Sequence, residues 1–513
     1  MQNEGRACES SPFSVYLCPS NEKIMENRKV IVNIQNVETR LPELRFATPL
    51  NWVIEEGQQW AVIGPNGAGK TLIADVMQRK FAFKEGEVSF GCEGKVSDLV
   101  KSIAFKDIYS LADCRNSYYQ QRWHSTETDD VPTVEEILKE DAGQEELHQV
   151  LALFGIEELL PKRLIFLSSG ELRKFLIVRT LLKHPRILIL DNPFIGLDAP
   201  SRGVLIDMLQ QMTKLKGVQV VLLLSNPDDI PKMVTHVLPV KERRCLEVKT
   251  PEEFLRDKEL ISSLFPSENE TGEPGFKDIQ LPVDGEKAHS EHKVTFRMEH
   301  VSIKYGSRTI LKDLDWEVRN GEKWALFGPN GAGKSTLLSL VYADNPQSYA
   351  NTLYLFDKKR GSGESIWDIK KRIGYVSPEM HLYYMENVPT LNIVGSGFFD
   401  SIGLYRKCSP EQQAVALAWM DIFGIADLKE RSFLSLSSGE QRLALLARAF
   451  VKDPDLIILD EPLHGLDVSN KKKAAGIIEK FCSRPGKTLI YVTHYPHELP
   501  ACVDKCFELI KHT

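Results

Sequence analysis

The stretch Trp324–Val341, WALFGPNGAGKSTLLSLV, places an apolar strand, a glycine-rich loop and an apolar helix in direct succession. Its three glycines let successive backbone N–H groups point inward, and the helix that begins near Lys334 adds its positive dipole end. This pattern predicts a phosphate-binding loop, in which Lys334 reaches the β and γ phosphates and the Ser335 hydroxyl ligates Mg²⁺. A glycine-rich surface turn would not explain why Gly-Lys-Ser falls where the helix begins.

The same pattern occurs earlier, at Trp60–Met77, WAVIGPNGAGKTLIADVM, with Lys70 and Thr71 in the same roles. The two lysines are separated by 334 − 70 = 264 positions, which is a domain-sized period. We therefore expect two tandem α/β domains, each with a mainly parallel sheet and a helical subdomain. The expected divisions are a disordered lead at 1–28, a first domain at 29–249, an acidic linker at 250–292 and a second domain at 293–513.

The composition fits a chain of this kind. The 513 residues are 42% hydrophobic and 26% charged, and the net charge of −7 offers no global attraction to nucleic acid or to an anionic membrane. No apolar run approaches the roughly 18 residues that span a bilayer, and the N-terminus has neither a secretory nor a transit pattern. The nine cysteines are scattered without metal-ligand pairs, so we expect reduced thiols in a cytoplasmic protein.

A second repeated motif narrows the family. Each half contains Leu-Ser-Ser-Gly-Glu, at 167–171 and 436–440, and its glycine lies 21 residues before the aspartate that ends an apolar strand, since 191 − 170 and 460 − 439 agree. With the phosphate loop, this spacing resembles the ATP-binding cassette (ABC) family, whose signature is usually LSGGQ. Serine at the third position, in place of glycine, is a mild departure in both halves.

The resemblance implies that each signature caps the γ-phosphate held by the other domain, so that the two domains pair head to tail around two ATP molecules. It also implies the positions of the ligands. The nucleotide-binding residues would be Gly64, Pro65, Asn66, Gly67, Ala68, Gly69, Lys70, Thr71, Gly328, Pro329, Asn330, Gly331, Ala332, Gly333, Lys334, Ser335, Thr336, Tyr305, Ser168, Gly170, Ser437 and Gly439. The Mg²⁺ ligands would be Thr71, Gln121, Asp191, Ser335 and Asp460.

The second domain carries the remaining machinery that the family uses. Asp460 would hold Mg²⁺ through water, Glu461 would orient or deprotonate the attacking water, and His494 would contact the γ-phosphate. Tyr305 lies 23 residues before Gly328 and resembles the aromatic residue on which ABC proteins stack adenine. A core tyrosine is the alternative interpretation.

The first domain departs from this pattern. Asn192 stands where the second domain has Glu461, and Asn226 stands where we expect the counterpart of His494. The position 23 residues before Gly64, which corresponds to Tyr305, is Leu41. Asparagine cannot accept the proton of water, and the loss of a general base typically costs about 10²- to 10⁴-fold in rate. We expect impaired chemistry there, with hydrolysis by another route as the alternative.

The glutamine loop shows the opposite bias. Both halves contain Val-Pro-Thr, and 12 residues before each threonine stand Gln121 and Pro378. The first half alone would then keep the glutamine that couples Mg²⁺ to a partner in this family.

Within ABC proteins, GSGESIWDIKKRIGYVS at 361–377 and FFDSIG at 398–403 resemble the ModF family, also called photorepair protein PhrA. This resemblance implies a cytoplasmic bacterial tandem ATPase named for an association with molybdate transport. Two functions remain open: the ATP-binding subunit of a membrane permease, peripheral on the inner face of the membrane, or a non-transport protein acting on ribosomes or in DNA repair. The stretch 250–293 holds 11 acidic and 5 basic residues, which disfavours contact with RNA and gives no strong nucleic-acid signal.

Overall fold

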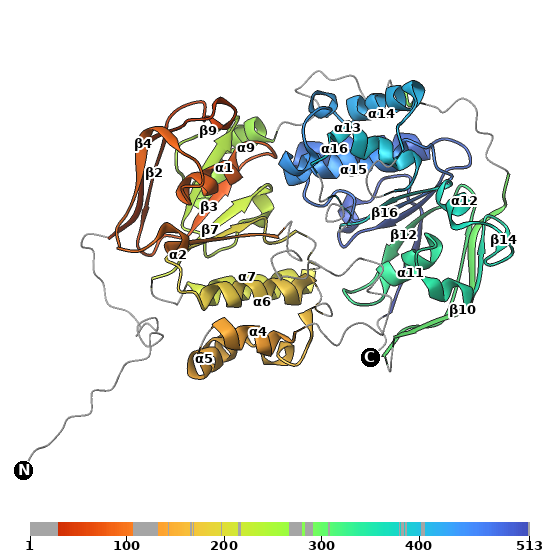
Figure 1. Ribbon diagram of the computed structural model, residues 1–513, viewed down its shortest axis with the longest axis horizontal. Helices are drawn as coiled ribbons and strands as arrows, with labels where there is room; N and C mark the ends of the chain where they lie inside the picture. The colour runs from red at the N-terminus through yellow and green to blue at the C-terminus, as the bar shows by residue number, and fades with distance from the viewer. Residues whose placement is uncertain are drawn as a thin grey trace, which may run out of the picture. The chain divides into compact units, whose positions relative to one another are not determined.

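The computed structural model forms two compact units, and among the described residues those up to Phe265 belong to the first and those from 280 onward to the second. Figure 1 shows the first in red to yellow-green and the second in green to blue. The structure describes residues 29–105, 132–141, 143–164, 167, 169–195, 197, 199–213, 217–265, 280–282, 291–305, 308–378, 380, 384, 387–401 and 406–510.

The central sheet of the first unit has the order β5-β6-β7-β3-β8-β9 and is parallel except for the β8–β9 hairpin. Its strands are β3 (Trp60–Ile63), β5 (Val100–Ala104), β6 (Ile187–Asp191), β7 (Gln219–Leu224), β8 (His236–Lys241) and β9 (Arg244–Cys245). Strands β3 and β7 are buried along their whole length, as expected for parallel strands covered on both faces.

A second sheet in this unit is antiparallel, in the order β2-β1-β4. It comprises β1 (Val30–Thr39), β2 (Leu50–Glu55) and β4 (Phe83–Phe90). Side chains from the two sheets share one core, in which the rings of Trp52 on β2 and Trp60 on β3 meet edge to face at 5.2 Å.

The helices of the first unit are α1 (Lys70–Met77), α2 (Val96–Leu99), α4 (Val134–Asp141), α5 (Gln144–Phe154), α6 (Ser169–Leu181), α7 (Ala199–Met212), α8 (Pro251–Arg256) and α9 (Lys258–Leu264). Figure 1 shows α4 and α5 beside α6 and α7, and contacts of α4 with α6 and of α5 with α7 join the two pairs. Helices α4, α5 and α6 form the helical part that the sequence predicts between β5 and β6, and α7 follows β6.

Helices α8 and α9 occupy the beginning of the predicted linker. Thr250 caps α8 through a capping box with Glu253, and Phe254 and Leu264 are fully buried. Since the first unit extends to Phe265, this part of 250–292 belongs with the first unit. Most of the remaining linker, and the predicted lead at 1–28, lie outside the described residues.

The second unit repeats the design. Its parallel sheet, β15-β16-β17-β12-β18, and its antiparallel sheet, β11-β10-β13-β14, lie in one continuous core. The strands are β10 (Val294–Tyr305), β11 (Arg308–Arg319), β12 (Lys323–Phe327), β13 (Thr352–Leu355), β14 (Lys358–Lys359), β15 (Ile373–Val376), β16 (Leu456–Asp460), β17 (Thr488–Val492) and β18 (Lys505–Glu508). The helices are α11 (Lys334–Val341), α12 (Ile366–Lys370), α13 (Thr390–Gly395), α14 (Pro410–Ile422), α15 (Ser438–Phe450) and α16 (Val468–Cys482). Two tandem α/β units with largely parallel sheets confirm the predicted fold class.

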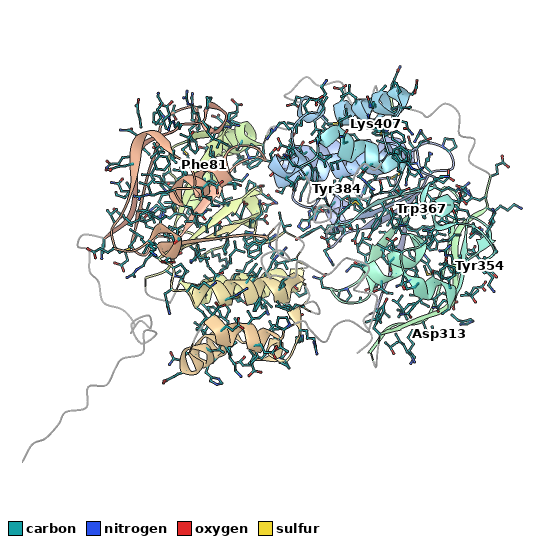
Figure 2. The ribbon with its side chains drawn as sticks, in the orientation of Figure 1. Phe81, Asp313, Tyr354, Trp367, Tyr384 and Lys407 are labelled. Atoms are coloured by element: carbon teal, nitrogen blue, oxygen red, sulfur yellow. The ribbon has the colours of Figure 1, made fainter. Side chains whose placement is uncertain are left out.

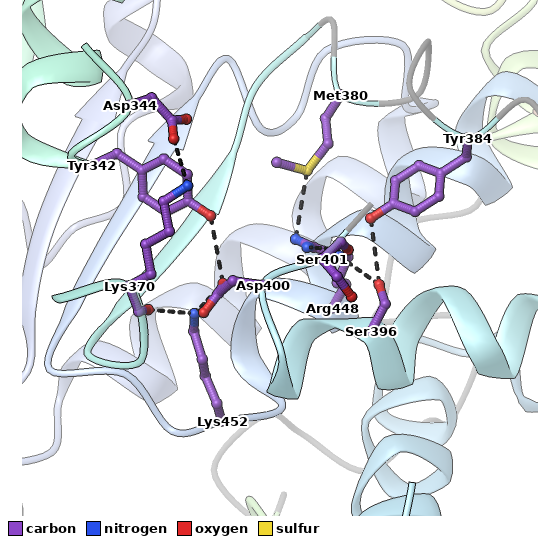
Figure 3. A network of polar contacts seen from close by, with 10 residues as sticks. All are labelled: Tyr342, Asp344, Lys370, Met380, Tyr384, Ser396, Asp400, Ser401, Arg448 and Lys452. Atoms are coloured by element: carbon purple, nitrogen blue, oxygen red, sulfur yellow. Dashed lines mark hydrogen bonds and ion pairs between the residues drawn. The ribbon is translucent and has the colours of Figure 1, made fainter. Parts of the chain in front are cut away.

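A network of buried polar side chains fastens α15 to the rest of the second unit (Figure 3). Just beyond α15, Lys452 forms an ion pair with Asp400, and the two side chains are 4% and 5% exposed. Arg448 donates from Nε to the Ser396 hydroxyl at 3.0 Å. That hydroxyl also lies 3.4 Å from the hydroxyl of the buried Tyr384, labelled in Figure 2. Helix α15 is therefore held by charge and hydrogen bonds as well as by packing.

Among the described residues, no helix is both long enough and apolar enough to cross a membrane.

Candidate functional site: two phosphate-binding loops

The first loop joins β3 to α1 and depends on glycine at two points. A Cβ on Gly64 would lie 2.1 Å from the carbonyl oxygen of Val240, so any side chain there would collide with the backbone of β8. Gly69, at φ 102°, precedes α1 in the left-handed region that favours glycine. The helix therefore begins at Lys70 with its free N–H groups facing the loop.

The predicted phosphate and magnesium ligands of this loop lie together. The Lys70 ammonium donates to the carbonyl oxygens of Gly64, at 2.7 Å, and Pro65, at 2.8 Å. The Thr71 hydroxyl donates to Oδ2 of Asp191 at 3.0 Å, across the end of β6. The lysine and the inward N–H groups can donate to the oxygens of a polyphosphate. The hydroxyl and the carboxylate supply oxygen ligands for Mg²⁺, so these residues fit MgATP.

The second loop, between β12 and α11, has the same geometry. A Cβ on Gly328, whose φ is 151°, would lie 2.7 Å from the carbonyl oxygen of Leu509. The Lys334 ammonium donates to the carbonyl oxygens of Gly328, at 2.7 Å, and Pro329, at 3.2 Å. Ser335 is exposed at the start of α11. Asp460 is buried at the end of β16, which is separated from β12 by one strand, β17.

Glu461, directly after β16, is held by two histidines. Its Oε1 lies 3.1 Å from His494 Nε2 and its Oε2 lies 3.0 Å from His464 Nδ1. Burial alone would raise the pKa of Glu461, but the two imidazoles outweigh burial and hold this pKa well below its usual range. The carboxylate is therefore ionised and oriented at neutral pH, as a base for water must be.

His464 is a site residue that the sequence analysis missed. It lies three positions after Glu461, and its backbone N–H donates to the Glu461 carbonyl at 3.2 Å, which closes the turn that brings the two side chains together. The residue type and this spacing are the signal that could have found it.

Buried Arg442 on α15 supports the main chain of this site. It donates to the carbonyl oxygens of Ser377, at 2.8 Å, and Glu461, at 2.5 Å. Burial lowers its pKa to about 10 in spite of the nearby Glu461 and Asp460 carboxylates. The helix that begins with the signature motif thus reaches the strand ends that carry the carboxylates.

The first unit has the same turn with different chemistry. Asn192 donates from Nδ2 to Asp191 Oδ1 at 3.0 Å, and its Oδ1 accepts from the Ser225 hydroxyl at 3.3 Å. Ile195 occupies the position of His464, with the same backbone bond to the residue after the aspartate. Asn192, at φ 49°, and Glu461, at φ 48°, both adopt the left-handed conformation. The first unit therefore has the same backbone turn as the second unit, but it lacks the ionised carboxylate between two imidazoles.

The strand register corrects one predicted correspondence. Asp191 pairs with Leu223, and Asp460 pairs with Val492, so the residues two positions further on are Ser225 and His494. The counterpart of His494 is therefore Ser225, and the assignment of Asn226 was wrong by one residue. Asn226 instead caps a 3₁₀ helix, where its side chain accepts from Asp228 N–H.

The register also corrects the glutamine-loop comparison. Ile103 pairs with Leu190, and Val376 pairs with Leu459, each leucine being next to the strand-end aspartate. Two positions further on, Phe105 is thus the counterpart of Pro378, and pairing Pro378 with Gln121 was wrong. Phe105 is buried, with the Arg173 guanidinium 5.4 Å from its ring centre. Gln121 lies outside the described residues, and its role as a metal ligand stays a prediction.

Tyr305 lies at the end of β10, half-buried against the core of the second unit. Its hydroxyl accepts from Asn345 Nδ2 at 3.0 Å, and burial raises its pKa. Leu41, 23 residues before Gly64, is 47% exposed. The adenine-stacking role of Tyr305 stays a prediction.

The signature motif of the second unit starts a helix with a defined cap. The Ser437 hydroxyl accepts from Glu440 N–H, Glu440 accepts from Ser437 N–H, and Gly439 is buried. In the first unit Gly170 lies in the first turn of α6, while Ser168 lies outside the described residues. The capping role of these residues toward a nucleotide of the other domain stays a prediction.

Comparison with known proteins places both loops in one family. Residues 47–195 and 311–464 match the model of the ABC transporter family. The chain is 37% identical over 471 residues to the ABC transporter ATP-binding protein ModF of Escherichia coli, covering 89% of this chain and 92% of that protein. It is 32% identical over 460 residues to an uncharacterized ABC transporter ATP-binding protein of Schizosaccharomyces pombe, covering 87% and 91% of the two chains.

Among solved structures, a model of ribosome-bound archaeal Pelota and ABCE1 matches with a TM-score of 0.54 and 20% identity, covering 88% of this chain and 72% of that chain. At this identity the likeness shows the fold alone.

Proposed function

The chain belongs to the ABC transporter family and is an ABC-type ATPase, and from this premise we propose that it binds one ATP with Mg²⁺ at each phosphate loop and hydrolyses ATP mainly at the second. The observation that carries the proposal is the difference between the two strand ends. Glu461 stands ionised between two imidazoles, whereas Asn192 stands between Asp191 and Ser225.

In the proposed reaction, water attacks the γ-phosphorus, its proton passes to the Glu461 carboxylate, and ADP and inorganic phosphate leave. Lys334 would neutralise the terminal phosphates, and Ser335 and Asp460 would hold Mg²⁺, which supplies charge neutralisation when bound. His464 and His494 would keep Glu461 ionised and aimed. At the first loop, Lys70, Thr71 and Asp191 would bind nucleotide and Mg²⁺, but Asn192 has no basic oxygen to receive the proton.

We further propose that each site is completed by the signature of the other domain, Ser168 and Gly170 for the second loop and Ser437 and Gly439 for the first. The basis is the family resemblance. Cross-links that join Lys70 to the region of Gly439, and Lys334 to the region of Gly170, would support this pairing. Cross-links that join the two phosphate loops directly would contradict it.

For the partner we propose a membrane permease, which the protein would serve as a peripheral ATP-binding subunit. The support is the likeness to a protein named as an ABC transporter ATP-binding protein and the acidic character of 250–293. Molybdate as the solute rests on the family resemblance alone. Action on ribosomes or in DNA repair is the alternative. Co-purification of a multispanning protein from membranes would favour the permease, and co-sedimentation with ribosomes would favour the alternative.

The test of unequal sites compares Glu461→Gln with its matched control, Asn192→Ala. Glu461→Gln removes the base but no phosphate ligand, so turnover should fall by about 10²- to 10⁴-fold with ATP binding retained. Asn192→Ala should leave most turnover intact. Steady-state phosphate release and equilibrium nucleotide binding measure both effects, and equal damage by the two substitutions would refute the assignment.

A further inference from the structure

The two phosphate loops are covered by different side chains. At the first loop, the two-residue turn between β8 and β9 lies directly against the glycine that precedes α1. The Cγ of Arg243 would be 3.3 Å from a Cβ built on Gly69, and the Arg243 N–H donates to the carbonyl oxygen of Ala68 at 2.9 Å. The main chain of the phosphate loop therefore fixes where the Arg243 side chain starts.

At the second loop the same place is apolar. A Cβ on Gly333 would meet Ile310 at 2.9 Å and Leu311 at 3.0 Å. Leu50 pairs with Val37 and Leu314 pairs with Val301, so Ala47 is the counterpart of Leu311. The smaller side chain of Ala47 leaves open the space beside Gly69 that Leu311 fills beside Gly333.

The space left by Ala47 is taken by the hairpin. Ala47 N–H donates to the Arg243 carbonyl at 2.9 Å, which ties the turn to the strand approach beside the loop. The guanidinium-bearing side chain of Arg243 thus replaces the aliphatic side chains found at the other loop.

The turn itself is unfavourable for arginine. Glu242 and Arg243 have φ values of 47° and 60°, the geometry in which two-residue hairpin turns take Asn-Gly. Glycine would satisfy this backbone without strain, whereas an arginine side chain there is held in a conformation that costs free energy. Lys241 and Arg244 flank the pair, so the hairpin tip is basic.

We propose that Arg243 is a nucleotide ligand of the first site, where its guanidinium binds the phosphate chain of a bound nucleoside triphosphate. The inference rests on the proposed function, because it assumes that the first loop binds nucleotide. The planar guanidinium offers a fork of donors that matches phosphate oxygens, and Arg243 is exposed with its Cγ beside Gly69.

One consequence concerns specificity. The second site offers Tyr305 as a platform for the base, whereas the position 23 residues before the first loop is Leu41. The first site would therefore recognise phosphate charge more than the base and bind GTP nearly as well as ATP.

The experiment uses the full chain carrying Lys334→Ala, so that binding reports on the first loop. Titration with ATP and GTP in the presence of Mg²⁺ is repeated after Arg243→Gly, which suits the turn and removes the side chain, and after Arg243→Lys. Arg244→Gln is the matched control, since it removes a neighbouring positive charge from the same hairpin. Lys70→Ala tests whether the first loop binds nucleotide at all.

Arg243→Gly should raise the dissociation constant for ATP about tenfold, the typical size of a charge-assisted hydrogen bond. Arg243→Lys should recover part of the loss and Arg244→Gln should change little. The difference should shrink at high salt, because an exposed ionic contact is screened. ATP binding by Arg243→Gly within about twofold of the parent, with binding abolished by Lys70→Ala, would overturn the inference and leave the proposed function standing. Binding that survives Lys70→Ala would refute the proposed first site, and the inference with it.

Discussion

Replacing His464 by Gln tests whether the paired imidazoles keep Glu461 ionised. Glutamine retains a hydrogen-bond donor for the carboxylate but carries no positive charge, so the change isolates the electrostatic part of the contact. Each oxygen of Glu461 meets one imidazole, at 3.0 and 3.1 Å, and the substitution removes one of these two imidazoles.

The size and sign of the effect follow from the site. Burial raises the pKa of Glu461 and the two histidines lower it, so losing His464 must raise this pKa. One opposite charge within 4–6 Å typically moves a carboxyl pKa by about 1–3 units, and each unit is tenfold in the ionised fraction below the pKa. Since the base works when ionised, the acid limb of the pH profile should move to higher pH by about 1–3 units, and turnover should change little near pH 8.

The assay is steady-state phosphate release at saturating MgATP from about pH 5 to pH 9. His300→Gln is the matched control, because His300 is 78% exposed and pairs with Asp313 on the antiparallel sheet. A loss that is the same at every pH would refute the reasoning, since it would mean that His464 does not act through the ionisation of Glu461.

Two further changes test stability. Asp400→Asn leaves the buried Lys452 without its carboxylate and should lower the free energy of unfolding by about 3–5 kcal/mol, whereas Asp400→Leu with Lys452→Met should cost much less, as urea denaturation would show. Burial lowers the pKa of Lys452 to about 8, so the folded state releases that proton first and the free energy of unfolding should rise from about pH 8 toward pH 10. Phe254→Ala should cost about 3–5 kcal/mol in the first unit, measured in the same way, and a loss below about 1 kcal/mol would show that α8 is peripheral to it.

Much of the fold could be read from the sequence because its signals are local. A glycine-rich loop between an apolar strand and a helix fixes the strand-loop-helix geometry, and apolar runs ending in aspartate fix β6 and β16. Helices α8 and α9 carried a visible start signal, Thr250-Pro251 followed by Glu253, but the acidic composition around them favoured a linker.

The site was harder to read because its pairings depend on register. Counting from Val-Pro-Thr placed Gln121 opposite Pro378, since intervening loops of different length cannot be corrected without the sheet. Without the sheet register, the counterpart of His494 was likewise placed at Asn226, one residue after Ser225. Arg243 carried no motif at all, because its contact with Gly69 joins a hairpin to a loop more than 170 positions earlier, and only the folded sheet brings them together.

The left-handed turn that follows each strand-end aspartate has the same backbone in both halves of the chain but carries a different residue in each. Its shape is fixed by main-chain bonds, from Asn192 N–H to Leu223 at 3.0 Å and from Glu461 N–H to Val492 at 2.9 Å. Asparagine tolerates this backbone more readily than glutamate, so the half without a base occupies the turn at lower conformational cost. Glu461 therefore bears more backbone strain than Asn192, and the catalytic role that we propose for Glu461 would justify that strain. Under the same proposal, the first half carries the more relaxed residue and keeps the main-chain frame on which Glu461 depends in the second half.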